Sequence, residues 1–168
     1  MKRLFTPLLL LLLAFPAYAQ ENGVAMLVID TDPKGTNVRE APGGRVAHVI
    51  PYGGKTDAEI EMRQVMATER EGQWFRVRLA DGSSGWMHAS VLGSCASATE
   101  DGPPSLHAEP DDSSAPVATV RDGTRLRLLD VRGDWAKMEY TDASGNKKAG
   151  WMMEHTLFSN PYNSCWQQ

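Results

Sequence analysis

The sequence has few residues that bind metals. It contains only two cysteines and four histidines. Zinc sites use Cys and His at short, regular spacings. The histidines do not occur at such spacings, and none has a cysteine pair nearby: they are His48, His88, His107 and His155. We therefore expect packing or solvated histidines, no metal site and no cofactor.

The sequence also lacks a hydrophobic run long enough to span a bilayer. Its most apolar run, residues 8–15, falls short of the roughly 20 residues that a transmembrane helix needs. The run follows Lys2 and Arg3 and precedes Ala17-Tyr18-Ala19, which is the pattern of a secretory signal peptide. We predict that residues 1–19 are removed by cleavage after Ala19. The mature protein would be periplasmic or secreted, with no stable membrane insertion, and no cysteine follows the leader to anchor a lipid.

Basic residues are scarce in the mature chain. The leader holds two of the seventeen basic residues and none of the twenty-one acidic ones, so the mature net charge is −6. Apart from Lys147-Lys148, the sequence shows no basic patch. A chain of this sign is repelled by phosphate backbones and anionic membrane surfaces. We expect no nucleic-acid partner.

One β-hairpin pattern occurs twice. Residues 72–87 and 133–152 each carry a Gly-x-Trp strand, a turn containing glycine and a Gly-Trp-Met strand. Upstream, residues 37–42 have a weaker partner in residues 105–110, and one cysteine follows each hairpin. The ordered recurrence predicts two copies of one small β-domain.

Composition divides the mature chain in two. Residues 95–104 are small, polar and punctuated by Gly and Pro, which is typical of a linker. We therefore predict a first domain over 20–94 and a second over 105–168. The first would open with a buried strand at 24–29, and the second would contain an alternating strand at 124–131.

The segment 55–71 allows two interpretations. Ile60, Met62 and Val65 fit an irregular strand, whereas Ala58 and Glu59 also suit a short helix. We favour the strand, because every neighbouring segment is predicted to be β.

These motifs resemble the bacterial SH3-like domain. The first copy carries the resemblance in an Asn-Val-Arg-x-x-Pro segment (37–42), a Gly-x-Trp-x-x-Val strand (72–77), a Gly-Trp pair (85–86) and a Ser-x-Leu closing segment (90–92). In the second copy Ser105-Leu106-His107 and Met138 depart from the pattern. The resemblance implies an all-β fold of two tandem small SH3-like β-barrels. It also implies grooves that recognise peptidoglycan peptides or other proteins.

The sequence offers no catalytic constellation. Cell-wall cysteine peptidases that carry SH3-like modules have a further domain with a Cys nucleophile and a distant His, and no residues are left over to build one. Cys95 lies among small residues without the expected Asp-Cys pair. We expect that the protein is not an enzyme.

The two cysteines are better explained as a structural pair. Each lies just past the last strand of its own repeat in an exported chain, which favours a Cys95–Cys165 disulfide. The tail 158–168 is rich in aromatic residues, and the disulfide would pin it. We expect the tail to pack in the cleft between the domains.

Three aromatic residues are candidate ligand contacts. Tyr52 lies among Pro and Gly in a predicted loop, and Trp86 and Trp151 lie on strands that can face either side of a sheet. Exposed aromatics beside a groove are common recognition anchors. Packing remains the alternative for all three, and it is the preferred interpretation for Trp74 and Trp135.

We therefore expect a non-enzymatic binding or adaptor protein of the bacterial envelope, whose partner is a cell-wall peptide or a wall-associated protein. The alternative is a periplasmic interaction protein of the inhibitor or immunity type that does not bind the wall.

Overall fold

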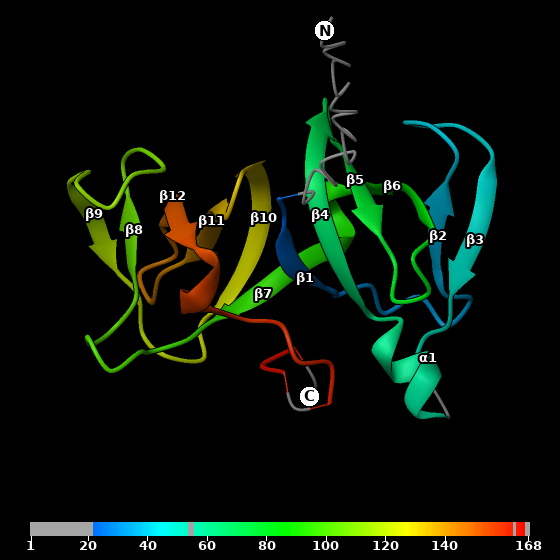
Figure 1. The fold of residues 1–168 in the computed structure, drawn as a ribbon. Coiled ribbons are helices and arrows are strands. Elements are labelled where there is room, and N and C mark those ends of the chain that lie inside the picture. Colours follow the sequence, from blue (N-terminus) through cyan, green and yellow to red (C-terminus); the bar gives the residue numbers. More distant parts are fainter. Residues whose placement is uncertain (1–21, 54–55, 163, 167–168) are drawn as a thin grey trace, which may run out of the picture.

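The computed structural model describes residues 22–53, 56–162 and 164–166. These residues form an all-β protein, as predicted, with one antiparallel sheet of thirteen strands and one short α-helix (Figure 1). The predicted leader, 1–19, and its cleavage site lie outside the described residues. Over the described ranges, no helix has the length and apolar character needed to cross a membrane.

The first half of the chain forms seven strands of the sheet, one α-helix and one 3-10 turn. They are β1 (Val24–Val28), β2 (Thr36–Arg39), β3 (Val46–Ile50), α1 (Asp57–Glu61), β4 (Gln64–Glu71), β5 (Trp74–Arg78), β6 (Ser84–His88), η1 (Ala89–Val91) and β7 (Leu92–Ala96).

The second half contains six strands and a second 3-10 turn. They are β8 (Ser105–His107), β9 (Pro116–Thr119), β10 (Arg125–Arg132), β11 (Trp135–Thr141), β12 (Lys147–Met153), η2 (Glu154–Thr156) and β13 (Leu157–Phe158).

The pairing order of the strands occurs twice, and β7 takes part in both copies. The first copy runs β3-β2-β6-β5-β4-β1-β7, and the second runs β9-β8-β12-β11-β10-β7-β13. Thus β7 is the last strand of the first copy. In the second copy it takes the position that β1 has in the first. The predicted linker, 95–104, begins inside this shared strand, with Cys95 and Ala96. Since β3 and β9 stand at opposite ends of the strand order, the sheet is not a closed barrel.

The two predicted hairpins form in the expected places. β5 pairs with β6 and β11 with β12, each in an unbroken antiparallel register. Gly82 and Gly145 have φ angles of 83° and 81° in the connecting turns, in a region that glycine adopts without a steric penalty. The repeated glycines are therefore explained by turn geometry.

The segment before β4 differs from the strand that the sequence favoured. Residues 57–61 form α1, and a strand begins only at Gln64. Thr56 and Glu59 make a capping box, in which each side chain accepts a hydrogen bond from the other residue's backbone N–H. This local signal favours a helical turn and was outweighed in the prediction by the β neighbours. Lys55 lies outside the described residues.

A single hydrophobic core runs through both halves. Strand residues alternate between the core and solvent, as on β5, where Phe75 and Val77 are buried while Arg76 and Arg78 are exposed. The largest fully buried side chains come from both repeats: Phe75, Met26, Ile50, Met87, Leu92, Leu106, Leu126, Leu128, Met138 and Met152. The halves are thus joined by packing as well as by β7.

Candidate functional site

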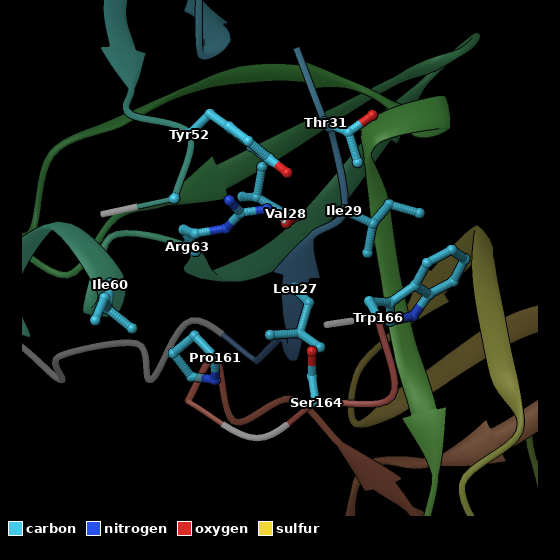
Figure 2. Close-up of a pocket in the computed structure, with 11 residues that line it drawn as sticks. Leu27, Val28, Ile29, Thr31, Tyr52, Ile60, Arg63, Pro161, Ser164 and Trp166 are labelled. Carbon is cyan, nitrogen blue, oxygen red and sulfur yellow. Dashed lines mark hydrogen bonds between the residues drawn. The ribbon is translucent and has the colours of Figure 1, made fainter. Parts of the chain in front are cut away.

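A pocket of about 360 Å³ lies where the first half meets the C-terminal tail (Figure 2). The end of β1, the loop after β3, α1 and the tail all contribute to it. The residues that line it are Leu27, Val28, Ile29, Thr31, Tyr52, Gly53, Ile60, Arg63, Pro161, Ser164 and Trp166.

Among the described residues that line this pocket, Arg63 is the only charged one. It follows α1, and its Nη2 donates hydrogen bonds to the carbonyl oxygens of Val28 (2.8 Å) and Asp30 (3.1 Å). Desolvation lowers the pKa of Arg63, while Tyr52 and Asp30 raise it by a smaller amount. Guanidinium groups remain protonated at neutral pH even so. Its Nη1 and Nε donors make no hydrogen bond among the described residues, so they can donate hydrogen bonds to a ligand.

Tyr52 stands at the mouth of the pocket. Its side chain is about half exposed, at 49%, and the guanidinium carbon of Arg63 lies 5.4 Å from the centre of its ring. This cation–π contact links the loop after β3 to the residue that follows α1. Figure 2 shows the Tyr52 and Arg63 side chains near Val28 of β1, with Leu27 of the same strand lower in the view.

The C-terminal tail forms the opposite wall, and a disulfide fixes it. Cys95 and Cys165 are bonded, as predicted. Trp166 Nε1 donates to the carbonyl oxygen of Ser94 at 2.9 Å, and Ser94 Oγ donates to the carbonyl oxygen of Phe158 at 3.0 Å. The tail therefore lies along β7, the strand that belongs to both repeats.

The tail also contacts strands from each half. On one side, Gln64 of β4 donates from Nε2 to the backbone and hydroxyl oxygens of Ser159. On the other side, Arg125 of β10 donates from Nε to the carbonyl oxygen of Cys165. The described residues of the tail therefore pack against strands of both halves of the sheet.

The pocket has the chemistry of a binding site. Its aliphatic residues can hold an apolar group, and the guanidinium of Arg63 can hold a carbonyl or carboxylate oxygen. Neither cysteine is free, since both are in the disulfide. Over the described ranges, His, Cys, Asp and Glu side chains form no group of three or more that could hold a metal ion.

The three predicted ligand contacts do not converge. Tyr52 lines the pocket, whereas Trp86 and Trp151 do not. Trp86 is half-buried on β6, opposite Arg39 of β2. Trp151 is only 3% exposed, and Arg132 lies 4.9 Å from the centre of its ring. Its side chain is therefore packed in this structure.

Sequence reasoning missed Arg63, Trp166 and the aliphatic residues of β1 as parts of one site. They come from chain segments that only the fold brings together. The one available signal was that Trp166 directly follows Cys165, because a disulfide at Cys165 fixes its neighbour in space.

Comparisons with known proteins give no family. No protein-family model and no curated protein matches the chain. Among solved structures, the chain is similar to NlpC1 from Trichomonas vaginalis, with 14% identity, 90% of this chain and 51% of that chain covered, and a TM-score of 0.34. It is also similar to NlpC2 from the same organism, with 12% identity, 83% and 49% coverage, and a TM-score of 0.34. The chain spans about half the length of these two structures.

Proposed function

We propose that this protein is an exported, non-enzymatic binding protein of the bacterial envelope, whose pocket at the tail takes a peptidoglycan peptide or a segment of a wall-associated protein. The leader pattern and the SH3-like motifs support this proposal, and the disulfide is compatible with an oxidising compartment. Each repeat would be an SH3-like unit, with β7 serving both.

The pocket is the observation that carries the proposal. It combines aliphatic walls, a half-exposed aromatic ring and a guanidinium whose Nη1 and Nε make no hydrogen bond among the described residues, and it lies against β1 of the sheet. Short peptides present the matching groups, which are small side chains, backbone carbonyls and carboxylates. The disulfide holds the tail wall in place, so little conformational entropy is lost when a ligand binds.

Co-sedimentation with purified peptidoglycan sacculi tests the proposal. We expect the wild type to sediment with sacculi and Tyr52→Ala to bind about tenfold more weakly, since aromatic anchors at binding sites commonly contribute that much. Tyr162→Ala is a matched control, because Tyr162 is similarly exposed, at 46%, and does not line the pocket. Trp86→Ala tests the other predicted anchor of the first repeat.

The outcomes separate the alternatives. If the wild type fails to sediment, the wall-binding proposal is wrong. If Tyr52→Ala and Tyr162→Ala bind like the wild type while Trp86→Ala does not, the ligand binds at β6 instead of the pocket.

The acidic surface favours a second candidate, an inhibitor or immunity-type protein that binds a basic envelope enzyme. Hydrogen bonds favour the ionised form of carboxylates in the turns. The Ser83 hydroxyl lowers the pKa of Asp81, and the backbone N–H of Asn146 lowers the pKa of Asp142. Such a complex would weaken as salt rises, because exposed charges are screened. Retention of a basic protein on the immobilised chain at low salt, without any binding to sacculi, would support this candidate.

A further inference from the structure

A second hollow, of about 1020 Å³, lies on the other side of Trp166. We call it the arginine groove, and it is formed by β10, the loop before it, the turn after β11 and the tail. Arg121, Arg125 and Arg127 line it together with Trp166. Arg125 and Arg127 are two residues apart on one strand, so they project from the same face, while Leu126 and Leu128 are buried behind them. This basic patch is not evident from the sequence, because Arg121, the arginines of β10 and Trp166 come together only in the fold.

The charge of these arginines is not balanced within the described residues. The ion pairs found there join Arg45 to Glu40, Arg76 to Glu69 and Lys147 to Glu139, and none includes an arginine of the groove. The Arg121 guanidinium has no hydrogen bond in the described chain. Arg125 and Arg127 each donate one hydrogen bond, to the backbone carbonyl oxygens of Cys165 and Ser90. Three exposed cations thus lie together on a chain that is otherwise acidic.

Trp166 makes cation–π contacts with two of the three arginines. The guanidinium carbons of Arg125 and Arg127 lie 5.5 Å and 5.6 Å from the centre of its ring. The indole is itself held by its hydrogen bond to Ser94 and by the neighbouring disulfide. Guanidinium groups that are held against a ring lose less freedom when they bind an anion, and their planar forks match a carboxylate.

We propose that the arginine groove binds carboxylate side chains of an acidic peptide segment. Asp142 also lines the groove, and it adds a negative charge that opposes a dense polyanion. The net charge of the predicted mature chain, −6, acts in the same direction. A ligand that carries one or two carboxylates meets less repulsion than a phosphate backbone does. This site is distinct from the proposed function, because it shares only Trp166 with the pocket.

Fluorescence anisotropy with two labelled peptides tests the proposal. The probes are acetyl-Gly-Glu-Ala-Glu-Ala-Gly and its isostere with Gln in place of Glu. We expect the wild type to prefer the Glu peptide by about tenfold, as charge-assisted hydrogen bonds to arginine require. The double variant Arg121→Gln/Arg127→Gln should lose that preference, while it keeps Arg125 and its hydrogen bond to the tail.

Arg78→Gln is the matched control, since Arg78 is exposed on β5, has no side-chain hydrogen bond or ion pair among the described residues and lies outside the groove. It should keep the wild-type preference, and thermal melting should show that the double variant is folded. Equal binding of both peptides, binding of neither, or an equal loss in Arg78→Gln would overturn the proposal. Displacement of the Glu peptide by lower concentrations of a phosphoserine peptide would overturn the assignment to carboxylates. Sacculus binding is a separate readout, so either proposal can fail alone.

Discussion

Arg63 shows how one side chain can support the fold and also face a ligand. Its Nη2 links two backbone carbonyls at the end of β1, those of Val28 and Asp30. Its remaining donors and its contact with Tyr52 face the pocket. The cost of desolvating the guanidinium is offset by these contacts, which are made by a charged donor and are stronger than neutral hydrogen bonds.

We predict that Arg63→Ala lowers the free energy of unfolding by about 1–3 kcal/mol, because it leaves two carbonyl oxygens without their donor. Urea denaturation measures the change. Arg78→Ala is the control and should change the stability by less than about 0.5 kcal/mol, as is usual for exposed sites. Equal stability of Arg63→Ala and the wild type would show that water replaces the guanidinium without cost.

At the scale of elements, β7 is the critical strand. It pairs with β1, β10 and β13, and all five of its residues are buried. Gly93 is its second residue, and it is paired with both Leu27 of β1 and Arg127 of β10. A Cβ atom on Gly93 would lie 2.6 Å from the carbonyl oxygen of Leu126, which is closer than real contacts allow.

We predict that Gly93→Ala destabilises the protein by about 1–3 kcal/mol or more, because a backbone oxygen in a paired strand cannot move aside easily. Ser84→Ala, at an exposed strand position, is the control and should melt like the wild type. The measurement is thermal unfolding followed by circular dichroism. A melting temperature of Gly93→Ala within one degree of wild type would contradict the described β7–β10 pairing.

The tail is the second decisive element, because it closes the pocket without being part of a long strand. Beyond β13, its described residues are held by the disulfide, by single hydrogen bonds and by the cation–π contacts of Trp166. Termini held by so few contacts fray when a covalent link is removed.

Replacing both Cys95 and Cys165 by Ser should lower the free energy of unfolding by up to about 4 kcal/mol, given the loop-entropy model and a sequence separation of 70 residues. The tail should also become a target of limited proteolysis before the rest of the chain does. Mass spectrometry of the fragments checks this. A tail that stays resistant in the double variant would show that the noncovalent contacts suffice.

At the scale of the molecule, the two repeats are not structurally independent units. The sheet continues from β1 through β7 into β10, and one hydrophobic core includes buried residues of both halves. Units of this size bury only about 60% of their unfolded surface, so each one gains from a shared strand. Trp166 separates the pocket from the arginine groove. It is held by Ser94 of β7 in the first half and by Arg125 of β10 in the second.

We predict that a fragment of residues 97–168, which lacks β7, does not fold cooperatively. A fragment of residues 89–168, which includes β7, should show a sharper transition, because β10 and β13 regain their partner. Both fragments are compared in reducing buffer so that the disulfide makes no difference. Cooperative melting of the shorter fragment at the same temperature would contradict a structural role of β7 in the second repeat.

Local signals explain what could be predicted. Each hairpin depends on alternation and a turn glycine within fewer than twenty consecutive residues, and the helix α1 depends on a capping box of four residues, Thr56 to Glu59. The disulfide was predictable because the chain has only two cysteines and a secretory leader pattern. The buried state of Trp151 was left open, because a strand residue in an alternating pattern can face either side.

The all-β character, the repeated order of motifs and the disulfide can be read from the amino-acid sequence, because each rests on neighbouring residues or on the presence of only two cysteines. The sharing of β7 by both repeats emerges only in the folded chain, as does the position of Tyr52, Arg63 and Trp166 around one pocket, with the arginines of β10 against the indole. Strand pairing and side-chain convergence depend on contacts between segments far apart in the chain. Their free energies depend on the packing of the whole molecule, and no local pattern encodes them.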